Sequence, residues 1–152
     1  MKAVLCLALY AACASPSAAP SATVTATTPD RLTPDDDALD DLTITVAYTD
    51  GDGDLGGGTA EIHDCRAEAL VTTLVIPSIA PPDVVSAHDE IRGSLELHVD
   101  DVGAIAPAAV PEVCAALGVT AGGASEARFC VILVDAAGHR GDGDCTAAVA
   151  LD

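Results

Sequence analysis

Lysine and large aromatic side chains are almost absent from this chain. Lysine and arginine together number 6 against 24 aspartates and glutamates, so the formal net charge is −18 at pH 7. A surface of this sign repels nucleic acid and anionic lipid headgroups. The chain has no tryptophan, two tyrosines and one phenylalanine, which argues against the aromatic platforms on which sugars and single-stranded nucleic acids stack. We therefore expect no nucleic-acid partner.

The N-terminus has the pattern of an export signal. Lys2 supplies a positive charge, residues 3–12 form an apolar run too short to span a bilayer, and small residues precede Cys13. The stretch from Leu9 to Cys13 resembles the bacterial lipoprotein signal, in which the cysteine is acylated and becomes the new N-terminus. The resemblance implies a signal peptide over residues 1–12, a lipid anchor on Cys13 and a place in the bacterial cell envelope.

The residues around Cys13 leave two outcomes open. If the cysteine is lipidated, the Ala14 that follows it favours the outer membrane by the sorting rule of enteric bacteria, and the lipid is the only contact with the membrane. However, Ala12-Cys13-Ala14 also satisfies the small-x-small rule for ordinary signal cleavage before Ser15. That cleavage would give a secreted or periplasmic protein.

Composition divides the rest of the chain at residue 42. Residues 14–29 are mainly alanine, serine, threonine and proline without charge, and residues 30–41 carry six aspartates and one arginine. Neither stretch has enough apolar surface to bury a core. Residues 13–41 are therefore predicted to form a disordered stalk, and residues 42–152 the folded domain.

The predicted domain consists of short strands separated by glycine and proline. Residues 43–48 and 94–99 alternate apolar and polar side chains, and residues 128–135 are apolar on both faces, as in a central strand. Further candidate strands are residues 58–65, 70–76 and 146–151, and residues 111–118 fit one or two helical turns. Six or seven such strands predict an all-β fold, namely an antiparallel β-sandwich.

Two segments, residues 49–58 and 135–144, combine aspartate with glycine. Alternating aspartate and glycine offers a hard cation carboxylate oxygens at every second residue, and glycine lets the backbone fold around the ion. The spacing of the first three aspartates and Glu61 matches an EF-hand loop. However, Leu55 stands where that loop requires glycine, and the segment before it is a strand. An EF-hand is therefore rejected.

Both segments resemble motifs of the bacterial Ig-like and cadherin-like modules found in envelope lipoproteins and adhesins. In these modules a strand runs into a T-D-x-D-G-D-L type turn, and a later strand reads V-x-D-x-x-G; the corresponding residues here are Thr49–Leu55 and Leu133–Gly138. The resemblance covers residues 42–151 and implies an Ig-like sandwich whose B–C and F–G loops emerge at one pole, with a short helical turn in the E–F connection. It implies a calcium site formed by Asp50, Asp52, Asp54, Asp135, Asp142 and Asp144.

The acidic loops can also be accounted for without a bound ion, in two ways that stay open. Asp-Gly sequences are good turn formers and need no metal. A salt-adapted organism also makes proteins that are acidic and poor in lysine throughout. Converging carboxylates, in contrast, repel by about 4 kcal/mol per pair at 4 Å and the effective dielectric of a protein surface. This cost favours a bound calcium ion over an empty cluster.

Four cysteines remain once Cys6 leaves with the signal and Cys13 is acylated or lost: Cys65, Cys114, Cys130 and Cys145. In an oxidising compartment they predict two disulfides, with three possible connectivities. The Ig-like mapping places Cys130 early on strand F, near the E–F turn that carries Cys114. It thus implies the pairs Cys114–Cys130 and Cys65–Cys145.

A zinc site is the rival use of these cysteines. Its ligands would come from His63, Asp64, Cys65, His139 and Cys145. The set lacks the paired Cys-x-x-Cys spacing of structural zinc sites, which argues against it.

The sequence does not point to an enzyme. Ser125 lies outside any Gly-x-Ser-x-Gly motif, and residues 88–90, His-Asp-Glu, have the pattern of a solvated loop. The prediction is a non-enzymatic, lipid-anchored envelope protein with a calcium-stabilised Ig-like domain in a structural or adhesive role. The alternative is a periplasmic or surface binding module that recognises a peptide or an envelope protein through a strand edge or a loop pole, without a metal.

Overall fold

The computed structural model describes residues 19–33, 41–67, 71–79, 89–100, 102–103, 109–121 and 125–152. Its elements are β1 (Ser21–Thr28), β2 (Arg31–Leu32), β3 (Leu42–Asp50), β4 (Thr59–Asp64), β5 (Val71–Val75), β6 (Ile91–Val99), α1 (Glu112–Ala116), β7 (Glu126–Ala127), β8 (Phe129–Val134), β9 (Asp144–Cys145) and β10 (Val149–Leu151). The all-β prediction is confirmed. The described part holds ten strands rather than six or seven, and three of them have two residues each.

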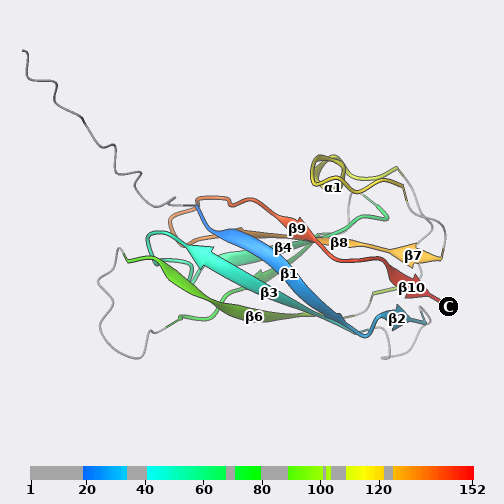
Figure 1. Ribbon diagram of the computed structural model, residues 1–152, viewed down its shortest axis with the longest axis horizontal. Coiled ribbons are helices and arrows are strands. Elements are labelled where there is room, and N and C mark those ends of the chain that lie inside the picture. Colours follow the sequence, from blue (N-terminus) through cyan, green and yellow to red (C-terminus); the bar gives the residue numbers. More distant parts are fainter. Residues whose placement is uncertain are drawn as a thin grey trace, which may run out of the picture.

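Two antiparallel sheets pack face to face in a sandwich-like arrangement (Figure 1). One has the strand order β1-β3-β6 and the other β5-β4-β8-β9. A small third sheet, β2-β10-β7, lies at the end of the molecule that carries the C-terminus (Figure 1). The inner faces of the two larger sheets share one core, which includes Ile44, Val46, Leu97, Ile62, Phe129, Val131 and Leu133.

The N-terminal strand corrects the predicted domain boundary. Residues 13–41 are predicted to be a disordered stalk, but residues 21–28 form β1, which pairs with β3 along its whole length. Ala22 and Val24 face the core, and the four threonines of the strand are β-branched residues that suit it. Leu32, 1% exposed, joins the core through β2. Composition predicted a disordered stalk because the side chains are small. Small side chains are enough to form a strand here, because β3 supplies the backbone hydrogen-bond partners.

The four cysteines form two disulfides, as predicted, but with other partners. Cys65 is joined to Cys114, and Cys130 to Cys145. The predicted pairs are wrong because β8 and β9 are antiparallel neighbours, which sets Cys130 directly opposite Cys145. Cys65 follows β4 and is left to reach Cys114, the buried residue of α1.

The short helix lies where the proline and glycine predict it. α1 begins after Pro111 and ends before Gly118, whose φ of 83° is a left-handed value that favours glycine. Within the described ranges, no helix has the length and apolar character needed to cross a membrane. The predicted signal peptide and Cys13 lie outside the described residues.

Candidate metal site

Four carboxylates meet at one pole of the sandwich. Asp50 ends β3, Asp52 and Asp54 lie in the loop that follows, and Asp135 directly follows β8. One oxygen from each of the four lies within 4.8 Å of the others. The end of β3 points away from the end of the molecule that carries the C-terminus (Figure 1). The structure thus brings together two loops that are about eighty residues apart in the sequence.

Strand alternation explains why two of these carboxylates are buried. The core-facing positions of β3 are Leu42, Ile44, Val46, Tyr48 and Asp50. Those of β8, followed by the next residue of the same phase, are Phe129, Val131, Leu133 and Asp135. Because side chains alternate across a strand, Asp50 and Asp135 continue the inward rows of the two facing sheets. Asp50 is 0% exposed and Asp135 3% exposed.

Backbone hydrogen bonds hold the two loops in place. The backbone N–H of Leu55 donates to Oδ2 of Asp50 at 2.8 Å, and that of Ala136 donates to the carbonyl oxygen of Asp54 at 3.1 Å. The turn from Asp50 to Leu55 depends on Gly53, whose φ is 77°. A Cβ added at Gly53 would lie 2.6 Å from the carbonyl oxygen of Asp89. The first loop is therefore fixed both to its own strand and to the loop after β8.

Three of the carboxylates each leave one buried oxygen without a hydrogen-bond partner among the described residues. These atoms are Oδ1 of Asp50, Oδ1 of Asp52 and Oδ1 of Asp54. A buried polar atom without a partner costs about 1–3 kcal/mol, and more when it is charged. Four ionised carboxylates this close also repel one another, by about 4 kcal/mol for a pair 4 Å apart at an effective dielectric of 20. Full ionisation without a counter-ion is therefore costly.

The pKa values of two of these carboxyls reflect this cost. Burial raises the pKa of Asp50, and the charges of Asp52 and Asp135 raise it further, while the hydrogen bond from Leu55 opposes the rise. Burial also raises the pKa of Asp54, followed by the charges of Asp135 and Asp52. These two groups favour a proton or a cation over the bare charge.

A histidine, His139, is attached to this cluster. Its Nδ1 lies 2.9 Å from Oδ2 of Asp135, and its backbone N–H donates to Oδ1 of the same residue at 2.8 Å. The hydrogen bond to Asp135 and the charge of that carboxylate raise the pKa of His139. His139 thus orients Asp135 from the solvent side, as hydrogen-bond donors commonly do for carboxylates that bind a metal.

The other two predicted ligands lie outside this group. Oδ2 of Asp144 accepts a hydrogen bond from the backbone N–H of Val24 at 2.8 Å, so this carboxylate fixes β1 instead. Asp142 is exposed, and its backbone forms an isolated parallel β-bridge with Ser21. The loop turns after His139 and becomes β9, and this turn carries both carboxylates along the edge of the sheet towards β1.

The predicted zinc alternative is not assembled. Cys65 and Cys145 belong to two different disulfides, and His139 is bonded to Asp135. His63 lies 3.4 Å from a carboxylate oxygen of Glu61. No thiolate is available to a metal from these disulfide-bonded cysteines in the described part of the chain.

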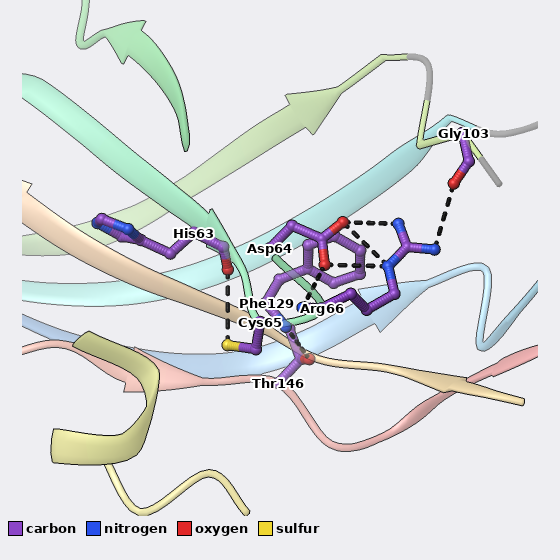
Figure 2. A network of polar contacts seen from close by, with 7 residues as sticks. All are labelled: His63, Asp64, Cys65, Arg66, Gly103, Phe129 and Thr146. Carbon is purple, nitrogen blue, oxygen red and sulfur yellow. Dashed lines mark hydrogen bonds and ion pairs between the residues drawn. The ribbon is translucent and has the colours of Figure 1, made fainter. Parts of the chain in front are cut away.

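A buried ion pair that the sequence analysis missed lies near the opposite end of β4. The guanidinium of Arg66 donates to Asp64 through Nη2 at 2.6 Å and through Nε at 3.0 Å, and Nη1 reaches the carbonyl oxygen of Gly103 at 3.2 Å (Figure 2). Asp64 is 8% exposed and Arg66 4% exposed. An acid and an arginine two residues apart at the end of a strand are the only sequence signal for this pair.

The carboxylate pole can hold one hard cation. Oxygen is the ligand that calcium and magnesium select, and aspartate carboxylates are among their commonest donors in proteins. The four oxygens come from Asp50, Asp52, Asp54 and Asp135.

No protein-family model, no curated protein and no solved structure matches this chain.

Proposed function

We propose that this chain is an exported bacterial envelope protein, lipid-anchored at Cys13, whose Ig-like domain is stabilised by calcium and has a structural or adhesive role. The observation that carries the proposal is the convergence of four carboxylates from two distant loops, with three buried oxygens that lack a partner among the described residues. A divalent cation would satisfy those oxygens and cancel the repulsion between them.

The number of carboxylates favours calcium over magnesium. Calcium accepts several carboxylate ligands at once, whereas magnesium usually keeps several waters and binds through one or two carboxylates. Four carboxylate oxygens lie within 4.8 Å of one another here. Two oxygens on opposite sides of a calcium ion lie about 5 Å apart, so the cluster is compatible with the calcium shell. Extracellular modules bind calcium at the weak, millimolar end of the range.

The strand order supports the Ig-like part of the proposal. If β1, β3, β4, β5, β6, β8 and β9 are named A, B, C, C′, E, F and G, the two sheets read A-B-E and C′-C-F-G. Immunoglobulin sandwiches likewise place A, B and E in one sheet and C, F and G in the other. In this mapping the carboxylates lie in the B–C and F–G loops.

The position of β1 refines the anchoring. Ser21 pairs with Thr49, beside Asp50, so the chain enters the domain at the carboxylate pole. Residues 14–20 connect Cys13 to β1, and a fully extended chain of this length reaches about 25 Å. A lipid on Cys13 would therefore hold the proposed calcium site close to the membrane surface.

Thermal unfolding in calcium and in chelator tests the proposal. Wild-type protein is melted by calorimetry in excess chelator and again at calcium concentrations of about 100 times the dissociation constant, where stabilisation of about 2.7 kcal/mol is expected. The matched control is Asp142→Asn, which removes a loop carboxylate outside the cluster and should keep the shift. Identical transitions with and without calcium would overturn the calcium site. Mass spectrometry of the mature N-terminus tests the lipid separately.

A second candidate function, the binding of an extended peptide, is favoured by the edge strand β5. β5 is the outer strand of its sheet within the described part of the chain, and Val75 is 75% exposed there. A groove of about 710 Å³ lies between residues 74–77 and residues 94–98. Glu96 and Asp100 line it, so the peptide that fits best is an extended one with basic residues.

Fluorescence polarisation with a labelled lysine–valine peptide tests this candidate. Val75→Lys should weaken binding by placing a like charge at the edge. Asp142→Asn, remote from the groove, changes the net charge by the same one unit and serves as the matched control. An equal loss in both variants would mean that only the net negative charge attracts the peptide, and would reject the groove.

A further inference from the structure

The two disulfides of this domain touch each other. Sγ of Cys65 lies 3.3 Å from Sγ of Cys130, although each belongs to a different disulfide. Neither sulfur carries a hydrogen in this state, so the approach is a van der Waals contact between two disulfides. The four sulfurs are linked in the order Cys114, Cys65, Cys130, Cys145 by the two disulfide bonds and this contact, and we call this linked set the row. The row bends at Cys65, since Sγ of Cys114 also lies within 4.8 Å of Sγ of Cys130.

The row is open to solvent at one end. Cys114 and Cys130 are 0% exposed and Cys65 is 7% exposed, while Cys145 is only partly buried. Cys145 also lies on β9, the outer strand of its sheet among the described residues. A thiolate from solution therefore meets Cys145 before any other sulfur of the row.

The inner pair of sulfurs is held by rigid parts of the fold. Cys130 lies on β8, between β4 and β9. Cys65 lies between Asp64 and Arg66, whose ion pair fixes this turn, and its sulfur is 3.7 Å from the carbonyl oxygen of His63 (Figure 2). The contact between Cys65 and Cys130 thus belongs to the packed core rather than to a loop surface.

We propose that these four cysteines are a thiol-exchange site that takes small thiols and passes the exchange inward from Cys145 to Cys114. An external thiolate attacks Sγ of Cys145, forms a mixed disulfide and releases Cys130 as a thiolate. Once its bond to Cys145 is broken, Cys130 can rotate about its Cα–Cβ bond into line with the Cys65–Cys114 bond; it then attacks Sγ of Cys65, and the bond to Cys114 breaks. The external thiol ends in a mixed disulfide with Cys145, and its proton passes to Cys114, which becomes a free thiol. The number of disulfides and thiols is unchanged, so atoms and electrons balance.

The exchange has a structural consequence at α1. Cys114 is the buried residue of this helix and is covalently held by Cys65. After exchange, Cys65 and Cys130 join the end of β4 to β8, while the helix keeps only its noncovalent contacts, among them those of Val119 and Leu117. A thiol-rich environment would thereby loosen α1 without opening the sandwich core.

Partial reduction under native conditions tests the exchange. The folded protein is treated with less than one equivalent of dithiothreitol, free thiols are blocked with N-ethylmaleimide, and the protein is digested with trypsin. Cleavage after Arg66, Arg92, Arg128 and Arg140 places each of the four cysteines in a separate peptide. We expect maleimide on Cys114 and Cys145, a new Cys65–Cys130 peptide pair and loss of the Cys65–Cys114 pair.

Two results would overturn the proposal. In the first, Cys130 and Cys145 are labelled together while Cys65–Cys114 stays intact. In the second, Cys65 and Cys114 are labelled together, which would mean that the reductant attacks the inner disulfide directly.

A variant that needs no external thiol gives a second measurement. Cys145→Ser leaves Cys130 unpaired, and we expect the Cys65–Cys130 pair to form with maleimide on Cys114. The mirror variant, Cys114→Ser, should form the same pair and leave Cys145 labelled. Maleimide on Cys130 in the first variant and on Cys65 in the second would reject the exchange. Both variants are measured after circular dichroism has shown wild-type strand content.

Discussion

Two aspartates of this domain, Asp64 and Asp50, are both buried, but the groups that surround their carboxylates differ. Asp64, 8% exposed, lies against Arg66, which supplies hydrogen bonds from its side chain and from its backbone N–H. Asp50, 0% exposed, accepts a hydrogen bond from Leu55 through Oδ2, while its Oδ1 has no partner among the described residues and lies near other carboxylates. The first site carries its cation within the chain, and in the proposed function the second takes its cation from solution.

The comparison shows what burial of a carboxylate requires. A buried charge is tolerated when it is paired and its oxygens are hydrogen-bonded, as Asp64 is by Arg66. A buried carboxylate beside other carboxylates is tolerated when it takes up a proton or a metal ion, which fits the raised pKa of Asp50. Stability near Asp64 should therefore be indifferent to calcium, whereas stability near Asp50 should depend on it.

The largest expected effect on the free energy of unfolding is at the ion pair of Asp64 and Arg66. Arg66→Ala should lower the free energy of unfolding by about 3–5 kcal/mol, because it leaves the buried Asp64 carboxylate unpaired. The loss should be the same in calcium and in chelator, as measured by urea denaturation. Adding Asp64→Asn should recover part of it by removing the charge. The control, Arg31→Ala, breaks the exposed ion pair with Asp152 and should cost less than about 1 kcal/mol. A comparable loss in both arginine variants would contradict the contrast.

The next largest effect is at Asp50, where a substitution should change stability in opposite directions with calcium and without it. Asp50→Asn should abolish calcium stabilisation of about 2–3 kcal/mol, because it removes a ligand. In chelator the same variant should equal or exceed the wild type in stability, because it removes one charge from a repelling group. Calorimetric melting in both buffers measures the two values. A variant that is weaker than the wild type in chelator would mean that the Asp50 carboxylate is stabilising by itself.

The pH dependence should distinguish the metal-free state from the calcium-bound state. In chelator, the raised pKa values of Asp50 and Asp54 mean that the native state holds protons above the ordinary value of 3.8, where the unfolded chain does not. The raised pKa of His139 acts in the same direction above 6.5. Stability in chelator should therefore fall as the pH rises above 3.8, where Asp50 and Asp54 lose their protons, and further above 6.5, where His139 loses its proton.

Calcium should reverse this slope, because its ligands must be deprotonated. Melting temperatures across the same pH range measure both slopes. At more acid pH, Glu61 adds an opposite trend: burial alone would raise its pKa, but hydrogen bonds from Arg140 and His63 outweigh burial and lower it, so its stabilisation is lost as the pH falls below 4.5. Parallel slopes with and without calcium would contradict a cation at the carboxylate pole.

The sequence contained much of the fold and part of the site. Alternation predicted β3 and β6, the unbroken apolar run predicted β8, and proline and glycine marked α1. The same alternation, continued by one more step, also places Asp50 and Asp135 on the inward faces of β3 and β8. That phase distinguishes them from Asp142 and Asp144, which follow a turn and so do not continue the alternation of β8.

Other features depend on contacts that no local pattern reports. β1 consists of small and β-branched residues whose composition resembles a linker, and it becomes a strand because β3 offers it an edge. The disulfide partners follow from the register of β8 against β9, which opposes Cys130 to Cys145. The ion pair of Asp64 and Arg66 lies within three residues, but its burial comes from segments distant in sequence, such as the one that carries Gly103.

The smallest expected effect tests whether the loop after β8 is held by its exposed ion pair or by the carboxylate pole. Arg140 reaches a carboxylate oxygen of Glu61 at 2.8 Å, with about half of its side chain exposed. Arg140→Gln should therefore cost only about 0.2–1 kcal/mol in chelator, as an exposed pair does. The calcium-induced shift of the melting temperature should stay at its wild-type size. The four carboxylates, the hydrogen bond from Leu55 to the Asp50 carboxylate and the backbone hydrogen bond from Ala136 to Asp54 are all untouched. If the shift instead disappeared, the loop would owe its position to Arg140, and the inward phase of Asp135 would not be enough to build the site.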